Sequence, residues 1–283
     1  MSGCLYIVST PIGNRGDITL RAIEVLQSVD LIAAESPRYS KGLLQYYGIK
    51  TSVLSLNTHN ESTLSTLLCK KLQRGLSIAI ISDAGTPLIS DPGYRLVVAA
   101  QKVNIRIVSI PGACAGISAL VSSGLSTDRF VFEGFLSAKD GLRRKKLEAL
   151  KMESRTLIFY ESVYRIKNLI NLLSEIFGSE RIATVARELT KKFETIYTNS
   201  LLELKKWISV NLIQKKGEFV VLVEGYFENT KKTKKKEQYH LLSVLLSELS
   251  LTQAVSLAVR ISGISRKKLY SLALAIQKNS YPL

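Results

Sequence analysis

The sequence predicts an α/β protein with two α/β domains followed by a small helical tail. Short apolar runs of strand length alternate with amphipathic stretches of helix length through most of the chain. The 283 residues exceed one typical domain and suffice for two. After Glu224-Gly225 the pattern changes to a lysine-rich stretch and then to helical periodicity alone. We therefore expect domains at residues 1–112 and 113–226, a basic linker at 227–239 and a helical tail at 240–283.

The first domain is expected to hold a parallel sheet with helices on both faces. Its apolar runs are separated by segments such as Thr19–Ser28 and Leu64–Leu72, in which leucine and isoleucine recur at helical spacing. Strands that alternate with helices of this length are joined by crossovers, which is typical of parallel sheets. The expected strands are Leu5–Val8, Leu31–Ala34, Val53–Leu56, Ile78–Ile81 and Ile105–Val108.

The second domain is expected to hold a mixed sheet. The segment between Ile182–Ala186 and Phe193–Tyr197 is too short for a crossover helix, so these two strands are expected to form a hairpin. Val163–Phe177 has one apolar face and is expected to form a helix that covers the sheet. The other expected strands are Phe130–Phe132, Leu157–Tyr160 and Phe219–Val223.

The tail is expected to contain two helices joined by a tight glycine turn. Thr252 is expected to cap a helix that ends near Gly263, and Ser265 is expected to cap the next one. Such a pair resembles a helix-turn-helix, although we favour an accessory helical hairpin over a DNA-binding element. The linker before it is expected to be solvated because like charges this dense resist packing. Its lysines are Lys231, Lys232, Lys234, Lys235 and Lys236.

The charge predicts a polyanionic partner. The chain has 39 Lys and Arg against 23 Asp and Glu, a net charge of +16 and a sequence pI near 9.7. Nucleic acid and an anionic membrane surface both fit such an excess. The uncharged stretch Ile107–Thr127 contains a proline and several glycines and serines, so no membrane span is expected there.

The rare residue types argue against a metal centre and a disulfide framework. Cys4, Cys69 and Cys114 are far apart and odd in number, and His59 and His240 are not in ligand spacing. We therefore expect no metal cofactor. The chain opens without a targeting signal, so we expect a cytoplasmic protein.

The segment Asp83–Gly93 is the principal candidate for ligand binding. It follows a fully apolar strand, and ligands of parallel α/β sheets bind beyond the carboxyl ends of the strands. Gly85 would admit the ligand close to the backbone, while Pro87 and Pro92 would fix the loop. The turn after the first strand has a single glycine and no Walker A pattern occurs, so the chain lacks a phosphate cradle. This excludes P-loop NTPases and disfavours NAD enzymes.

Three further segments are weaker candidates. Ile110–Ala119 is rich in small residues, which would suit either a flat ligand or close packing between domains. Leu157–Ser162 and Ala186–Lys192 each place charged side chains at the end of a strand. A basic cluster follows Gly134-Phe135, and an aromatic residue beside a basic run would suit phosphate contact with base stacking, although a solvated helix face is the alternative. The cluster consists of Lys139, Arg143, Arg144, Lys145 and Lys146.

Together these motifs resemble the tetrapyrrole methylase superfamily. Within it, the chain is similar to the bacterial enzymes that methylate a cytidine 2′-oxygen of 16S ribosomal RNA. The resemblance runs in order from the first strand to Gly225. It rests on Leu5–Val8, Thr10–Asn14, Asp17–Thr19, Ser82–Gly93, Arg129-Phe130, Glu133–Phe135, Arg155–Ser162, Ala186–Lys191 and Lys216–Glu218.

The resemblance implies a tetrapyrrole methylase fold, S-adenosylmethionine in a cleft between the two α/β domains, and a homodimer. The substrate would be a cytidine in the decoding region of small-subunit ribosomal RNA, presented by the assembled subunit. Arg38, in a loop expected to face the substrate, joins the basic cluster as an RNA contact. The implied cofactor residues are Pro11, Asp83, Gly85, Thr86, Pro87, Ile89, Ala113, Tyr160, Leu189 and Glu218.

A ribose hydroxyl is a weak nucleophile, so a base near it would help the reaction. Glu161, Glu188, Asp91 and Glu35 are the candidates, and Lys191 and Arg187 are expected to orient a phosphate. The sequence does not choose among the four carboxylates.

Two departures and two rival functions accompany the resemblance. Ser36-Pro37 stands where the family commonly has Asp-Thr, and Ser137 stands where it has Pro. A porphyrinoid C-methylase on the same fold is disfavoured by the basic clusters and the helical tail. A non-catalytic RNA-binding protein is disfavoured by the intact Asp83–Gly93 loop.

Overall fold

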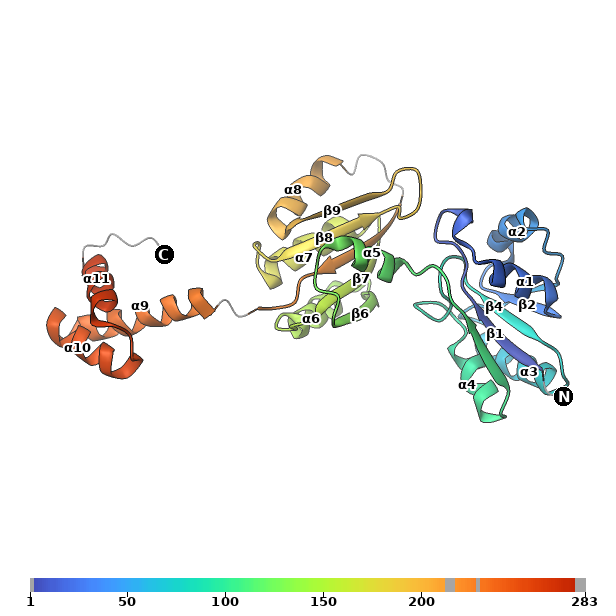
Figure 1. The fold of residues 1–283 in the computed structure, drawn as a ribbon, viewed down its shortest axis with the longest axis horizontal. Helices are drawn as coiled ribbons and strands as arrows, with labels where there is room; N and C mark the ends of the chain where they lie inside the picture. Colours follow the sequence, from blue (N-terminus) through green and yellow to red (C-terminus); the bar gives the residue numbers. More distant parts are fainter. Residues whose placement is uncertain (1–2, 212–216, 228–229, 278–283) are drawn as a thin grey trace. The chain divides into compact units, whose positions relative to one another are not determined.

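The computed structural model describes residues 3–211, 217–227 and 230–277, and it divides into two compact units, Met1–Tyr226 and Phe227–Leu283. The first unit contains both sheets and the second contains only helices (Figure 1). No helix within the described ranges is both long and apolar enough to cross a membrane.

The first sheet is parallel, as the sequence predicted, with strand order β3-β2-β4-β1-β5. Alternate residues of each strand enter two cores. Ile78 and Ile80 pack with α3 and α4 on one face, and Ala79 and Ile81 pack with α1 and α2 on the other. The elements are β1 Cys4–Val8, α1 Leu20–Ser28, β2 Leu31–Ala34, α2 Pro37–Tyr46, β3 Val53–Ser55, α3 Glu61–Gln73, β4 Ile78–Ile81, α4 Tyr94–Lys102 and β5 Arg106–Ile110.

The second sheet is mixed, again as predicted, with order β6-β7-β10-β8-β9. Only the β6–β7 pair is parallel, and β8 and β9 form the expected hairpin. One face packs against α5, and the other carries the larger core beneath α6, α7 and α8. The elements are α5 Ala115–Ser123, β6 Phe130–Phe135, α6 Asp140–Leu150, β7 Thr156–Ser162, α7 Ile166–Phe177, β8 Ile182–Arg187, β9 Thr195–Ser200, α8 Leu201–Asn211 and β10 Glu218–Val223.

The second unit is a three-helix cluster of α9 Thr230–Glu248, α10 Leu251–Ser262 and α11 Arg266–Gln277. Gly263 ends α10 in the left-handed conformation, at φ 69°, as the sequence predicted. The predicted cap Thr252 is wrong, because Ser250 precedes the helix and forms a capping box with Gln253. Helix α9 begins at Thr230, so regular structure starts within the stretch expected to be linker.

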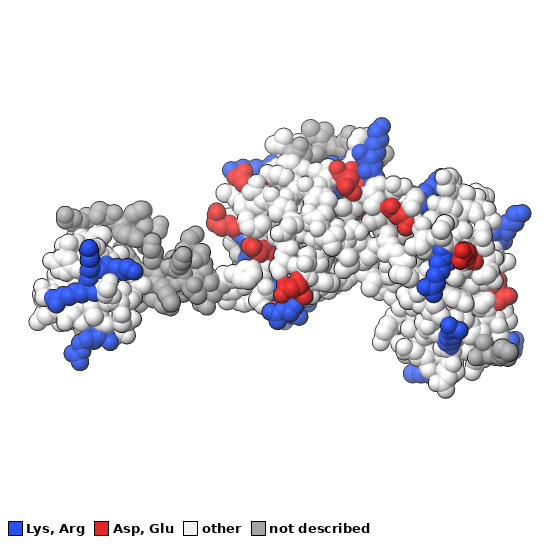
Figure 2. Space-filling view, in the orientation of Figure 1, with Lys and Arg blue, Asp and Glu red and all other residues white. Residues whose placement is uncertain are grey.

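Cations are spread over the surface of both units. The face seen in Figure 2 shows Lys and Arg interspersed with acidic residues on the first unit and only Lys and Arg among the coloured residues of the second. Arg260, Arg266, Lys267 and Lys268 are exposed on α10 and α11.

Candidate active site

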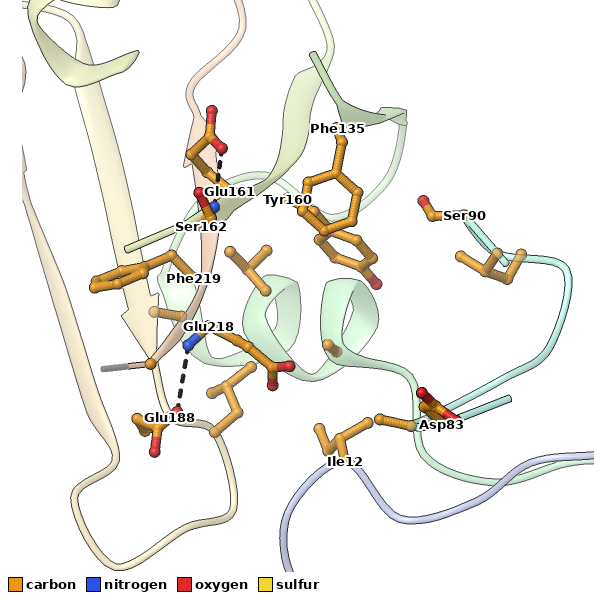
Figure 3. A pocket seen from close by; sticks show the side chains of 18 of the residues that line it. Ile12, Asp83, Ser90, Phe135, Tyr160, Glu161, Ser162, Glu188, Glu218 and Phe219 are labelled. Carbon is orange, nitrogen blue, oxygen red and sulfur yellow. Dashed lines mark hydrogen bonds between the residues drawn. The ribbon is translucent and has the colours of Figure 1, made fainter. Parts of the chain in front are cut away.

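A cavity of about 650 Å³ lies in the first unit and is lined by loops from both sheets (Figure 3). It lies beyond the carboxyl ends of strands in the parallel sheet, where α/β proteins bind ligands. The first sheet's loops contribute Ile12, Glu35, Asp83, Gly85, Thr86, Ile89 and Asp91. The second sheet and its loops contribute Phe135, Tyr160, Glu188, Leu189, Lys191, Glu218 and Val220.

The Asp83–Gly93 loop is held in a strained backbone conformation. Gly85, at φ 80°, pairs with Thr10 through two backbone hydrogen bonds of 2.9 and 3.0 Å. Leu88 and Ser90 have φ values of 72° and 74°, in the left-handed region that such side chains rarely adopt. Strain of this kind persists where surrounding contacts fix it, and it concentrates at functional sites.

Glu61 supplies one of those contacts, which no sequence pattern predicted. Its buried carboxylate accepts hydrogen bonds from the backbone N–H groups of Gly93, at 2.9 Å, and Arg95, at 2.8 Å. These donors lie at the start of α4, where the helix dipole favours a negative charge. A residue of α3 thus anchors the far end of the loop that carries Asp91. Only the three-dimensional packing of α3 beside α4 brings these groups together.

Three carboxylates gather on the first sheet's side of the cavity. Glu35 accepts a hydrogen bond from the Asp83 backbone N–H at 3.3 Å, and Asp83 accepts one from the Ser36 N–H at 3.1 Å. Burial, aided by the charges of Glu35 and Asp83, raises the pKa of Asp91 to about 7. Burial also raises the pKa values of Glu35 and Asp83. The cluster therefore favours a cation, or a proton, among its oxygens.

Ser36-Pro37 has a local structural role. Ser36 is the N-cap of α2, where its hydroxyl accepts a hydrogen bond from the Tyr39 N–H, and Pro37 occupies the first helical turn. Serine and proline are favoured at these two positions. The departure from Asp-Thr therefore starts α2 in a regular way, while Glu35 and Asp83 keep acidic groups beside it.

The opposite wall of the cavity is aromatic. The Tyr160 hydroxyl accepts a hydrogen bond from the Gly116 N–H at 3.0 Å, which fixes the ring against the start of α5. Phe132 and Phe135 contact that ring edge to face, with centroid distances of 4.9 and 5.6 Å. Burial raises the pKa of Tyr160, so the phenol stays neutral as a polar group in an apolar wall.

Lys191 closes a third side. Its ammonium lies 3.0 Å from Glu188 Oε1 and 3.3 Å from Glu218 Oε2. Burial opposes its charge, but the hydrogen bonds to these carboxylates outweigh that and raise the pKa of Lys191. The Asn14 N–H donates to Thr190 Oγ1 at 3.0 Å, and a Cβ on Gly13 would lie 2.5 Å from Lys191 Cγ. The turn after β1 is therefore locked against this loop of the second sheet.

Most of the cofactor residues expected from the sequence meet in this cavity. Pro11, Pro87 and Ala113 do not line it, although the Ala113 carbonyl accepts a hydrogen bond from Thr86 Oγ1 at 3.0 Å and so shapes the wall. Arg187 is also outside the lining, with its guanidinium over the ring of Phe219. The residues that do line it are Asp83, Gly85, Thr86, Ile89, Tyr160, Leu189 and Glu218.

Glu161 borders the cavity, but its carboxylate serves a different purpose. Successive side chains of a strand face opposite sides of the sheet, so Glu161 points away from Tyr160, as Figure 3 shows. Its side chain is fully enclosed, and Oε1 forms an ion pair with Arg165 Nε at 2.8 Å. This arrangement removes the reason for choosing Glu161 as the base.

Arg143 does not fit the RNA-binding role expected for it. Its side chain is buried, and the guanidinium donates to the Ser137 carbonyl at 3.0 Å and to Asn168 Oδ1 at 2.7 Å. It stabilises the loop before α6 from inside. The sequence did not reveal this because Arg143 lies in a run of cations that all look alike in sequence, four of them on α6. Lys139 and Lys145 are exposed, as is Arg38 on α2.

Two other members of the cluster are engaged in surface ion pairs. Arg144 contacts Glu175 through two hydrogen bonds of 2.9 Å, and Lys146 lies 2.8 Å from Glu133.

Within the described ranges, no group of three or more His, Cys, Asp or Glu side chains is arranged to hold a metal ion.

Comparison with known families agrees with this geometry. Residues 4–205 match the family described as Tetrapyrrole (Corrin/Porphyrin) Methylases. The chain belongs to the tetrapyrrole methylase family. Residues 236–277, in the helical unit, match a domain described as the RsmI C-terminal HTH domain. Both matches confirm the resemblance that the sequence motifs predicted.

Relatives within the tetrapyrrole methylase family match nearly the whole chain. A Haemophilus influenzae protein named Ribosomal RNA small subunit methyltransferase I is 46% identical over 276 residues, which cover 97% of this chain and 98% of that protein. A protein of the same name from Escherichia coli O157:H7 is 46% identical over 275 residues, covering 97% and 96%.

Solved structures of the family share the fold at low sequence identity. Uroporphyrin-III-C-methyltransferase from Thermus thermophilus aligns with a TM-score of 0.55 at 18% identity, over 78% of this chain and 94% of that one. Diphthine synthase aligns with a TM-score of 0.59 at 14% identity, over 83% and 95%. These structural similarities support the fold, but they do not identify the substrate.

Proposed function

We propose that the protein transfers a methyl group from S-adenosylmethionine to a ribose 2′-oxygen of small-subunit ribosomal RNA. The observation that carries the proposal is full-length similarity to proteins named Ribosomal RNA small subunit methyltransferase I, in a chain whose cavity between the two sheets' loops suits this cofactor. The choice of a cytidine in the decoding region, and of the assembled subunit as substrate, follows from the resemblance. Ribosome assembly would place the activity in the cytoplasm.

The pocket fits S-adenosylmethionine chemically. The cofactor is cationic at its sulfonium and amino groups, and Glu35, Asp83 and Asp91 present acidic oxygens to that end. Tyr160 and Leu189 offer apolar surface for the adenosine. The cofactor carries no phosphate, which agrees with the absence of a glycine-rich phosphate cradle from the sequence. When bound, S-adenosylmethionine supplies an electrophilic methyl group.

The chain's own residues would position the nucleophile and take its proton. Catalysis of this kind depends on holding the hydroxyl in line with the methyl group and excluding water. Asp91 is the best-placed base, since its pKa of about 7 lets it accept a proton near neutrality and release it afterwards. Glu161 is enclosed with Arg165, and Glu188 is bound to Lys191, so both are less suited.

The substrate assignment is tested most simply in cells. Ribosomal RNA is isolated from cells with and without the gene, digested to nucleosides and measured by mass spectrometry. The small-subunit RNA of the two kinds of cell is expected to differ by one 2′-O-methylcytidine. Identical nucleoside profiles would contradict the proposed activity.

The RNA-binding role of the surface gives a salt-dependence prediction. Replacing Arg38, Lys139 and Lys145 together with alanine should weaken binding to small-subunit RNA. The magnitude of the log–log salt slope should also fall by about 2, because each phosphate contact contributes about 0.7 for single-stranded RNA. Filter binding over a range of salt concentrations measures both quantities.

Lys70, Lys71 and Arg74 provide a matched control, since they lie at the end of α3 that leads into the amino end of β4, whereas the pocket lies beyond the carboxyl ends of the strands. Alanine at these three positions should leave the slope unchanged. Equal effects of the two triple variants would show that only overall charge matters.

We also propose a homodimer, formed through an apolar patch on α5 and β6. Its exposed side chains are Ile117 at 45%, Val121 at 71%, Phe130 at 40% and Phe132 at 36% exposure. Exposed apolar patches of this kind mark protein interfaces. Val121→Arg is therefore expected to convert a dimer into a monomer at micromolar concentration, as measured by light scattering.

Val210→Arg is the control and should leave the mass unchanged. Val210 is about as exposed as Val121, and it lies on α8, which covers the other face of the second sheet. A wild-type protein that is monomeric at this concentration would overturn the proposed homodimer.

A further inference from the structure

Phe135 is an exposed aromatic side chain in a position that core packing does not explain. It is 56% exposed, yet it lines the cavity beside Asp91 and Tyr160. Among the exposed phenylalanine side chains it is distinguished by its place in the cavity, where a ligand can cover its apolar surface. Figure 3 shows its ring above Tyr160, across from Ser90.

A β-bulge sets the direction of this side chain. Phe132 pairs with Ile158 and Gly134 with Phe159, so Glu133 is an extra residue in β6 and the register shifts there. After the shift Phe135 pairs with Tyr160 and lies on the same face of the sheet. Without the bulge, strict alternation would place Phe135 on the opposite face. Bulges beside binding sites commonly redirect a side chain in this way.

The bulge is held against the loop that carries Asp91. Gly134 has φ 60°, which favours glycine, and a Cβ there would lie 2.9 Å from Ser90 Oγ, so any other residue would displace the Ser90 hydroxyl. Asp91 follows Ser90 directly in this loop and also lines the cavity. Phe135 therefore contacts Tyr160 on one side and faces the segment Ser90-Asp91 on the other, as Figure 3 shows for Ser90.

We propose that Phe135 stacks on the base of the target nucleotide and so brings the ribose of that nucleotide to Asp91. An unpaired nucleobase presents a flat face that stacks well on aromatic rings, and RNA-binding proteins use this contact widely. The edge-to-face contact with Tyr160 holds the Phe135 ring, and the 56% exposure of that side chain leaves ring surface for the base. The inference rests on the proposed function, and it names the subsite that admits a nucleobase.

The test compares Phe135→Ala with Phe135→Tyr, using small ribosomal subunits that lack the modification and labelled S-adenosylmethionine. For Phe135→Ala the KM for the subunits should rise about tenfold to one hundredfold, the range expected for loss of one stacked base. Phe135→Tyr should remain near wild type because it keeps the ring. The Kd for S-adenosylmethionine, measured by calorimetry without RNA, should stay unchanged in both variants.

Met152→Ala is the control, since Met152 is 61% exposed and precedes the amino end of β7, whereas Tyr160 lies near the carboxyl end of that strand. A weaker Kd for S-adenosylmethionine in Phe135→Ala, with an unchanged KM for the subunits, would mean that the ring binds the cofactor and would overturn the inference. Unchanged values of both would also overturn it. Failure of the wild-type protein to label the subunits would instead refute the proposed function.

Discussion

Gly85→Val is expected to abolish binding of S-adenosylmethionine. Gly85 lines the cavity at φ 80°, where a β-branched side chain is strongly disfavoured. An added Cβ would lie 3.2 Å from Ile12 Cγ2 and 3.5 Å from the Ala113 carbonyl oxygen, so valine would fill the space next to the loop backbone. We expect calorimetry to detect no binding at cofactor concentrations that saturate the wild-type protein.

The control separates loss of the site from loss of stability. Gly48 has a similar φ of 65°, but a Cβ there meets nothing within 4 Å. Gly48→Val therefore introduces comparable backbone strain, about 1–3 kcal/mol, without touching the cavity. It should bind the cofactor as the wild type does. A folded Gly85→Val protein with wild-type affinity would show that the Asp83–Gly93 loop does not hold the cofactor.

Asp91→Asn is expected to lower kcat by about one hundredfold to ten thousandfold, the usual effect of removing a general base. With the wild-type protein, kcat/KM should rise as the pH passes through about 7, because the Asp91 carboxylate must be ionised to accept the proton. The residual activity of Asp91→Asn should lose this dependence. Steady-state assays across the pH range measure both effects, and Asp128→Asn, at an exposed site, should change neither.

The same group predicts an opposite effect on stability. Burial raises the pKa of Asp91 in the folded protein above its unfolded value, so the folded state binds the proton more tightly. This contribution to stability is full below the unfolded pKa and is lost as the pH rises through about 7. Above that pH, Asp91→Asn should therefore melt at a higher temperature than the wild type while being less active. If Asp91→Asn and the wild type had equal melting temperatures and equal kcat, Asp91 would not be the catalytic base.

Much of the fold was predictable because each strand has a local signal. The alternation of short apolar runs with amphipathic helices sufficed to predict both sheets and the β8–β9 hairpin. Strand ends were less certain, since β6 extends to Phe135 through a bulge that apolarity alone does not mark. The cap at Ser250 was missed because two hydroxyl residues lie near the start of α10 and both satisfy the local preference.

The site was predictable only where its residues follow strands or carry a family motif. The Asp83–Gly93 loop met both conditions. Glu61 met neither, because its partners Gly93 and Arg95 are distant in sequence. Arg143 shows the converse, since a cation in a basic run is expected in solvent, and here Ser137 and Asn168 satisfy it inside the protein. Long-range packing determines such cases.

One labelling experiment tests directly whether the protein methylates a ribose oxygen in small-subunit RNA. The protein is incubated with labelled S-adenosylmethionine in three separate reactions. One contains small subunits lacking the modification, one contains naked ribosomal RNA, and one contains a porphyrinoid precursor. We expect label in the assembled subunits, recovered after alkaline hydrolysis as a dinucleotide whose 2′-hydroxyl is blocked. Label on a base, or on the porphyrinoid alone, would contradict it.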